Sequence, residues 1–332
     1  MNYIVITSIN TPTAAVKAYS ELPDFRLVVV GDRKSPKDWE CGKSRFLGLD
    51  EQKNLGFTLE SHLPENHYCR KMLGYLLSIE SGARVIVDTD DDNIPKDDYF
   101  IPDFNGEFSR TEEDLDFINV YNLFSDQAIW PRGLPVDQIQ RNDSGTALKS
   151  GKSSVGIFQG LADGDPDVDA IYRLTSDAEC NFHNREPIVL AKGTIAPFNS
   201  QNTFFKSDLF PLLYLPTTVT FRFTDILRGL VAQPIMWELG YELAFSGPSV
   251  VQIRNPHDYF QDFLSEIPMY VNTRKVIELV TDSVRVGGDI FEMLFNAYTA
   301  LERAQIVEAR ELDCLLAWIS DMKKVSQVPE PR

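Results

Sequence analysis

The sequence predicts an α/β protein built around a largely parallel sheet. Three observations predict it: strand-like and helix-like segments alternate over the first hundred residues, the composition is that of an ordinary globular chain, and the length suits one elaborated domain or a domain with an appendage. The 332 residues are 43% hydrophobic and 24% charged, which excludes a disordered, collagen-like or coiled-coil chain.

The first hundred residues supply the strands and helices of this sheet. Apolar runs at residues 3–8, 25–30 and 84–87 predict three strands, and the segments 11–22 and 66–81 are predicted to be helical. Because the strands alternate with helices, we expect a parallel sheet covered on both faces. Ligands of such sheets bind beyond the carboxyl ends of the strands.

The rest of the chain follows a different pattern. Residues 100–220 hold shorter apolar runs separated by proline, glycine and aspartate, which predict a mixed sheet with long loops. Within this part, the polar, Gly/Ser-rich segment 141–154 predicts a surface loop. From residue 272 onward the apolar spacing predicts helices, with a break at residues 287–288, where two glycines stand.

Charge and cysteine content restrict the partners and the compartment. Acidic residues outnumber basic ones 49 to 32, and the formal charge of −17 repels phosphate backbones, so we expect no nucleic-acid partner. The four cysteines lie far apart without metal-type spacing, which indicates reduced thiols. The first apolar run has no basic start and is short, and no run approaches a membrane span. We therefore expect a cytoplasmic protein without a membrane span.

An acidic run at the end of the third predicted strand is the strongest chemical signal. Asp88, Asp90, Asp91 and Asp92 directly follow the apolar residues 85–87. Clustered carboxylates repel one another, and a bound cation compensates them. Because hard oxygen ligands favour Mn²⁺ or Mg²⁺ over zinc, the run predicts a metal site formed by Asp90 and Asp92. A solvated acidic turn is the alternative.

Cationic and titratable side chains complete the candidate site. Arg70 and Lys71 begin the helix before the third strand, and Arg132 and Arg254 lie in Gly/Pro-containing loops. Arginine in such loops suits bidentate phosphate binding, with surface ion pairs as the alternative. His257, close to Arg254, is a candidate metal ligand, although a lone histidine is more often structural.

Acidic residues in the second half of the chain receive two different predictions. Asp225 stands within the apolar and aromatic residues 221–226 and is a candidate general base. The alternative is a salt bridge to Arg222 or Arg228. The four aspartates between residues 163 and 169 lie in a loop with glycine and proline and are predicted to be solvated.

Taken together, these motifs resemble the STELLO-like glycosyltransferase family. The blocks that carry the resemblance occur in order over residues 3–270: VVGDRK at 29–34, RKxxGYL at 70–76, DDDN at 90–93, WPRG at 130–133 and RNPHDY at 254–259. More distantly, they are similar to the plant reversibly glycosylated polypeptides, which are UDP-arabinopyranose mutases.

The resemblance implies a GT-A fold and a metal-dependent glycosyltransferase. It implies a Rossmann-like nucleotide-binding half over residues 1–100, a mixed acceptor half over 101–270, and a C-terminal helical segment over 271–327. The implied ligands are a nucleotide-sugar donor, a UDP-sugar in this case, a glycan or small-molecule acceptor, and Mn²⁺ or Mg²⁺.

The resemblance also assigns roles by position. Asp90 and Asp92 form the DxD pair, His257 is the C-terminal metal or phosphate ligand, and Asp225 is the acceptor-side acid. The residues implied to bind the nucleotide sugar are Thr7, Asp32, Arg70, Lys71, Asp90, Arg132 and Arg254.

Two other functions stay open. The first is a nucleotide-sugar mutase. The mutases carry a second arginine seven residues after the first, and counted from Arg132 that position is Ile139 here, which argues against it. The second is a non-catalytic binding or assembly protein, which the intact acidic run disfavours. The crowded apolar residues at 312–319 fit either a homodimer interface or packing on the protein's own core.

Overall fold

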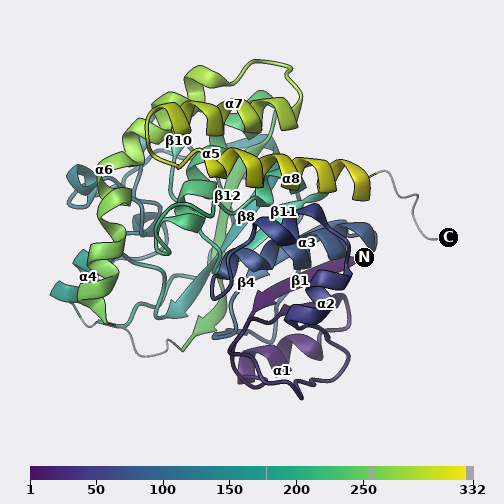
Figure 1. The fold of residues 1–332 in the computed structure, drawn as a ribbon. Helices are drawn as coiled ribbons and strands as arrows, with labels where there is room; N and C mark the ends of the chain where they lie inside the picture. The colour runs from purple at the N-terminus through teal and green to yellow at the C-terminus, as the bar shows by residue number, and fades with distance from the viewer. Residues whose placement is uncertain (177, 254–257, 327–332) are drawn as a thin grey trace.

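The fold of the computed structural model is mixed α/β, with helices on both faces of a ten-stranded sheet (Figure 1). The structure describes residues 1–176, 178–253 and 258–326. In sheet order the strands are β3 (Arg45–Leu47), β2 (Phe25–Val30), β1 (Asn2–Thr7), β4 (Val85–Thr89), β11 (Asn202–Lys206), β8 (Lys149–Gly164), β6 (Asn105–Arg110), β9 (Ile188–Leu190), β12 (Glu242–Gln252) and β5 (Asn93–Pro95). A small second sheet pairs β7 (Asp116–Phe117) with β10 (Thr194–Ile195).

Eight α-helices are present among the described residues. They are α1 (Ala14–Ser20), α2 (Leu49–Asn54), α3 (Lys71–Glu80), α4 (Ala170–Thr175), α5 (Thr224–Glu238), α6 (Tyr259–Ser283), α7 (Ile290–Arg303) and α8 (Arg310–Val325). Short 3₁₀ turns that matter for the site are η1 (Thr58–His62) and η2 (Tyr68–Arg70). No helix of the described chain is both long and apolar enough to cross a bilayer.

The sheet has a parallel half and a mixed half, as the sequence predicts. Strands β3, β2, β1 and β4 run parallel, and β11 pairs antiparallel with β4 and begins the mixed half. In the mixed half, β8 and β12 form a parallel pair. The three strands expected in the first hundred residues are confirmed, but β4 continues to Thr89, so Asp88 lies inside the strand and is buried.

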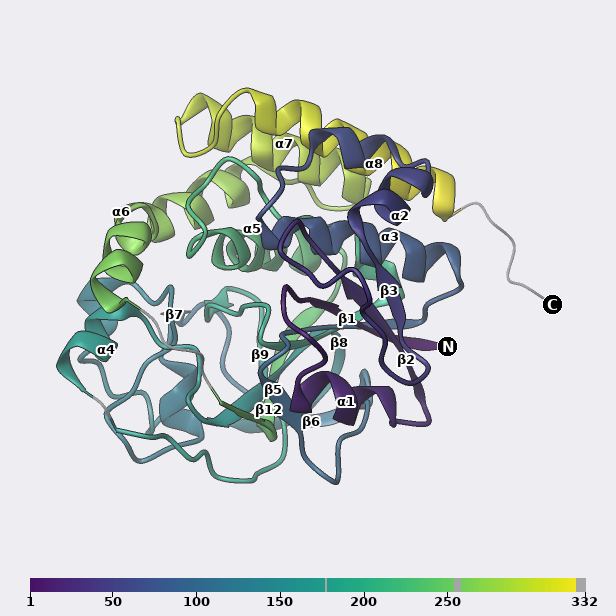
Figure 2. The ribbon, with the colours of Figure 1, turned by 60° about the horizontal axis from the view of Figure 1, so that its bottom comes forward.

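Side chains of the parallel strands alternate between two cores, one on each face. Val5 and Val28 pack in the larger core with α3, α5, α7 and α8, whereas Ile4 and Val29 pack in the smaller core with α1. Gly74 of α3 allows a close approach to the sheet, because a Cβ there would lie 2.7 Å from Val5 and from Val30. Figure 2 shows α7 and α8 along one side, beside α2 and α3, with α4 and α6 at the other end.

Two predicted segments differ from the structure. The prediction of a surface loop over 141–154 is wrong for residues 149–154. These residues begin β8 and pair antiparallel with β6. The polar composition of this stretch is typical of an exposed ladder, and backbone hydrogen bonds to β6 hold it extended. The helix expected from residue 272 begins at Tyr259, capped by Asp258, so the expected boundary at residue 270 falls inside α6.

The C-terminal helices pack on the protein's own core. The predicted break at residues 287–288 is confirmed, since α6 ends at Ser283 and α7 begins at Ile290. On α8, Leu315 and Trp318 are fully buried in the larger core, whereas Leu316 is 50% exposed. Most of the apolar residues at 312–319 are therefore buried in the protein's own core.

A candidate nucleotide and metal site

Two adjoining pockets lie at the carboxyl edge of the parallel strands. The aromatic pocket has a volume of about 410 Å³, and its lining includes Asp32, His67, Arg70 and residues 8–10. The acidic pocket has a volume of about 290 Å³, and its lining includes the carboxylates of residues 90–92. The residues that line both pockets are Thr7, Tyr68, Asp91 and Phe221.

Chain direction brings distant segments to this edge. Strands β1, β2 and β4 end here, and the parallel pair β8 and β12 also end here, at Gly164 and Gln252. The antiparallel β11 begins at the same edge, so the turn of residues 199–201 before it joins the pocket wall. The edge therefore collects polar groups from both halves of the sheet.

Three aromatic rings separate the two pockets. His67 stacks on Tyr68 with ring centroids 5.3 Å apart and an interplanar angle of 13°, and Phe221 meets Tyr68 edge-on at 4.6 Å. The Tyr68 hydroxyl donates to the Phe221 carbonyl at 3.3 Å and accepts the Asp225 N–H at 3.0 Å. Burial lowers the pKa of His67, which favours the neutral ring.

Two of the residues that the resemblance implies for nucleotide-sugar binding, Thr7 and Asp32, lie at the aromatic pocket. Thr7 is the last residue of β1, and Asp32 follows β2 and accepts the N–H of His67 at 3.1 Å. Arg70 also lines this pocket, but its guanidinium is buried and directed into the protein. It donates to Gln52, to the Leu63 carbonyl and to Glu60, at 2.7, 3.2 and 2.9 Å.

Asp90 faces the acidic pocket with an incompletely compensated carboxyl group. Its side chain is 44% exposed, and its Oδ1 lies 3.2 Å from Nζ of the buried Lys71. Desolvation at the strand end outweighs Lys71, and the carboxylates of Asp92 and Asp88 add to it, so the pKa of Asp90 is raised to about 7. A cation at this position would relieve the repulsion.

The two following aspartates tie the strand end to its neighbours. Asp91 Oδ2 accepts from Ser8 and, at 3.1 Å, from the Asn10 amide, which links it to the end of β1. Asp92 Oδ2 accepts from the Gln252 amide at 3.2 Å, which links it to the end of β12. The acidic run is therefore tied to the ends of β1 and β12.

Beneath the acidic run, Asp88 bridges two buried cations. Its oxygens accept from Lys71 Nζ at 2.8 Å and from Arg228 at 2.6 Å. Burial alone would raise the pKa of Asp88, but the two cations lower it below its usual value. Arg228 also donates to the Asn199 carbonyl and the Ser200 hydroxyl at 3.0 and 3.1 Å, so Asp88 indirectly fixes the turn before β11.

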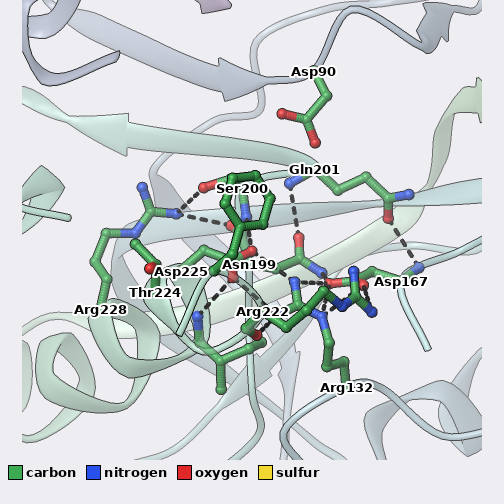
Figure 3. Close-up of polar contacts among 12 residues, drawn as sticks. Asp90, Arg132, Asp167, Asn199, Ser200, Gln201, Arg222, Thr224, Asp225 and Arg228 are labelled. Carbon is green, nitrogen blue, oxygen red and sulfur yellow. Dashed lines mark hydrogen bonds and ion pairs between the residues drawn. The ribbon is translucent and has the colours of Figure 1, made fainter. Parts of the chain in front are cut away.

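Across the pocket, Arg132 forms a saturated cluster with Asp167 and Asp225 (Figure 3). Its Nε donates to Asp167, its Nη1 to the Arg222 carbonyl and to Asp225, and its Nη2 to both aspartates. All five N–H groups of Arg132 thus have protein acceptors, and the side chain is only 5% exposed. A phosphate would have to displace one of these contacts to reach Arg132.

Asp225, the predicted base, has its acceptor positions occupied. Oδ1 accepts from Arg132 and from the Ile226 amide, both at 3.0 Å, and Oδ2 accepts from Arg132 at 2.8 Å and from the Ser200 amide at 3.2 Å. Neither Arg222 nor Arg228, the partners expected from spacing, forms the close ion pair; Arg132 does. The carboxylate therefore holds Arg132 and the Ser200 turn together.

The prediction that residues 163–169 form a solvated acidic loop is wrong. Asp167 pairs with Arg132, and Asp169 is fully buried, where it caps α4 and accepts from Trp130 at 2.9 Å. Burial raises the pKa of Asp169 to about 6. The missed signal is that this string begins at the carboxyl end of β8, where polar residues of such sheets meet.

Asp90 and Asp92 are the predicted metal ligands that lie within the described residues. Arg254 and His257 lie outside the described residues. Across the ranges that the structure describes, no three His, Cys, Asp or Glu side chains converge as a ready ligand set. The hard oxygens of Asp90 and Asp92 fit Mn²⁺ or Mg²⁺, which proteins often bind through one or two carboxylates and the phosphates of the substrate.

A large mixed α/β sheet with C-terminal helices and carboxylates at the edge of its parallel half is consistent with a GT-A-like fold. A sequence profile of the STELLO glycosyltransferases matches residues 222–328. The chain is 29% identical over 342 residues to "Probable glycosyltransferase STELLO1" and 28% identical over 345 residues to "Probable glycosyltransferase STELLO2", both of Arabidopsis thaliana.

These alignments cover nearly all of this chain but less than half of each relative. They include 96% and 97% of this chain, and 44% and 45% of the two Arabidopsis proteins. The resemblance to the STELLO glycosyltransferases that the motifs indicated is therefore confirmed.

Proposed function

We propose that this chain is a metal-dependent glycosyltransferase that uses a nucleotide-sugar donor, a UDP-sugar, and a glycan or small-molecule acceptor. The observation that carries the proposal is the pair of adjoining pockets, one walled by aromatic rings and the next by the acidic run. The similarity to two proteins named probable glycosyltransferases supports the reaction class.

In this proposal the donor lies across the boundary between the pockets. Its nucleoside occupies the aromatic pocket, near Thr7 and Asp32, and its diphosphate lies at the acidic pocket. Asp90 and Asp92 hold Mn²⁺ or Mg²⁺ there. When bound, the ion would neutralise negative charge on the departing diphosphate. The raised pKa of Asp90 supports this assignment, because it indicates carboxylates that the protein alone does not compensate.

The contacts of Asp225 favour positioning over proton transfer. A general base needs an oxygen within reach of the acceptor hydroxyl, and both oxygens of Asp225 accept two hydrogen bonds from the protein. We assign Asp225 to holding Arg132 and the Ser200 turn, which fixes the acceptor side of the acidic pocket. This arrangement suits a reaction in which Asp225 only positions the acceptor.

Binding and turnover test the proposal together. Calorimetry with UDP, with and without Mn²⁺, should show binding that requires the metal, and a screen of nucleotide sugars should show Mn²⁺-dependent release of free nucleotide. In Asp92→Asn this metal-dependent binding should be lost, whereas the matched control Asp98→Asn, at an exposed loop residue, should bind as the unmodified chain does. UDP binding of equal strength without any divalent ion would contradict the metal assignment.

No observation favours mutase activity over transfer. Arg141, the arginine nearest to the position where mutases carry their second one, pairs with Asp143 at 2.6 Å and is not among the residues that line either pocket. Incubation with UDP-arabinopyranose should therefore produce no furanose form.

A further inference from the structure

The C-terminal helix α8 carries a fully buried carboxylate that contacts one loop. Glu311, in the first turn of α8, accepts the N–H of Thr217 at 3.0 and 2.9 Å and the N–H of Thr218 at 2.8 Å. It also accepts from the hydroxyls of Tyr214 and Thr217. Just before α8, the N–H of Glu308 donates to the Thr218 hydroxyl at 3.1 Å.

The far end of this loop is a wall of the candidate site. Phe221 lines both pockets, and its carbonyl accepts from Tyr68. The next carbonyl, that of Arg222, accepts from Arg132. The loop of residues 214–223 is thus anchored to α8 at one end and to the pocket boundary at the other.

Burial makes this anchor strong and specific. A carboxylate without water is tolerated only when donors satisfy its oxygens, and Tyr214, Thr217 and Thr218 of the loop donate to Glu311. Removal of the carboxylate would leave the Thr217 and Thr218 amides without their acceptor. These two amides lie only three to four residues before Phe221.

We propose that Glu311 is a positioning residue that fixes the loop of residues 214–223, and with it Phe221, at the boundary between the two pockets. Through this contact, the C-terminal helix α8 helps to set the shape of the proposed donor site. The nature of the ligand rests on the proposed function, whereas the anchoring of the loop does not.

The variant Glu311→Gln tests the anchor with little change of size. It places an amide NH₂ where the loop presents N–H donors. Asp289→Ala is the control for the loss of a helix-capping carboxylate that does not bond to the loop: Asp289 caps the neighbouring α7 by accepting from the Phe291 and Glu292 amides. Hydrogen exchange measured by mass spectrometry should speed up about tenfold over residues 216–223 in Glu311→Gln and stay unchanged there in Asp289→Ala.

The functional consequence is measured with UDP and Mn²⁺. The dissociation constant for UDP should rise about tenfold in Glu311→Gln and by less than about twofold in Asp289→Ala. In a Phe221→Ala background, Glu311→Gln should add little further loss, because both changes then act through the same ring. A purely structural role for Glu311 would instead give additive losses.

Two results would overturn the proposal. One is unchanged exchange over residues 216–223 in Glu311→Gln; the other is faster exchange with a UDP affinity equal to that of the unmodified chain. If the unmodified chain does not bind UDP, the donor assignment fails, and the exchange data still decide whether Glu311 anchors the loop. Should Glu311→Gln not fold, Thr217→Val removes only the hydroxyl contact and should raise exchange in the same segment.

Discussion

Two groups of carboxylates face each other across the acidic pocket, and they differ in how far the protein compensates their charge. The strand-end acids, Asp90 to Asp92, follow β4, and the pKa of Asp90 is raised to about 7. The arginine cluster joins Asp167 and Asp225 to Arg132, whose five N–H groups are all engaged. The protein compensates the charge of Asp90 incompletely, whereas Asp167 and Asp225 share one buried arginine.

This difference separates carboxylates that can bind a ligand from carboxylates that hold the protein rigid. A buried carboxylate paired with a bidentate arginine has little to gain from a ligand, because its charge and its acceptor positions are used. A carboxylate whose neighbours raise its pKa gains from a divalent ion. In the proposed function, the arginine cluster fixes the shape of the acceptor side, and the strand-end acids hold the cation on the donor side.

Substitution of Arg132 should have the largest effect, and the effect should be on the free energy of unfolding. In Arg132→Ala, Asp167 and Asp225 stay buried without their cation, and the expected loss is about 3–5 kcal/mol of unfolding free energy. Urea unfolding followed by circular dichroism measures it. Arg310→Ala removes an exposed pair with Glu308 and should cost about 0.5 kcal/mol or less. Equal losses in the two variants would show that the cluster is not structural.

A substitution among the strand-end acids should affect activity and not folding. In Asp92→Asn, metal-dependent turnover of the donor should fall about a thousandfold, because one anionic ligand of the proposed cation is gone. The circular dichroism spectrum should be unchanged. Asp98→Asn, exposed and outside the pocket lining, is the control for the loss of one negative charge. Turnover of Asp92→Asn at the rate of the unmodified chain would contradict the metal assignment.

The comparison also separates what sequence could and could not predict. The strand-end acids were predictable because a short, uninterrupted apolar run precedes them, and a strand that ends in charge marks the sheet edge. Asp167 and Asp225 lie 58 residues apart, and each pairs with Arg132 at a separation of 35 or 93 residues. Such pairing depends on the order of β8, β11 and α5 in space, which spacing along the chain does not encode.

Glu311 illustrates the same limit from the C-terminal end. In the sequence it is one acid among several near the start of a helix, where acidic residues are common because they complement the helix dipole. Its partners, Thr217 and Thr218, are more than ninety residues away. Tyr68 and Phe221 were missed for a similar reason, since an aromatic residue near a helix start is usually part of a core.

The raised pKa of Asp90 predicts a pH dependence for metal binding. Below about pH 7 the carboxyl group holds a proton that a cation must displace, so Mn²⁺-dependent UDP binding should weaken as the pH falls. Between pH 7.5 and 5.5 the affinity should drop about twentyfold. In Asp90→Asn the affinity should be lower at pH 7.5, and its remaining pH dependence should be only that of the UDP phosphate, whose second pKa is about 6. Calorimetry across the range measures both, and a flat profile in the unmodified chain would contradict the assignment of the titration to this group.

The smallest of these effects is expected for Asp225→Asn, and it decides between two roles. The asparagine keeps one acceptor for Arg132 but turns an NH₂ toward the remaining donors, so we expect turnover to fall about tenfold through misplacement of the Ser200 turn. Removal of a general base would cost between about a hundredfold and ten-thousandfold and would eliminate one limb of the pH–rate profile. Steady-state rates from pH 5.5 to 9 therefore separate a positioning residue, which leaves the profile unchanged in shape, from a base, which does not.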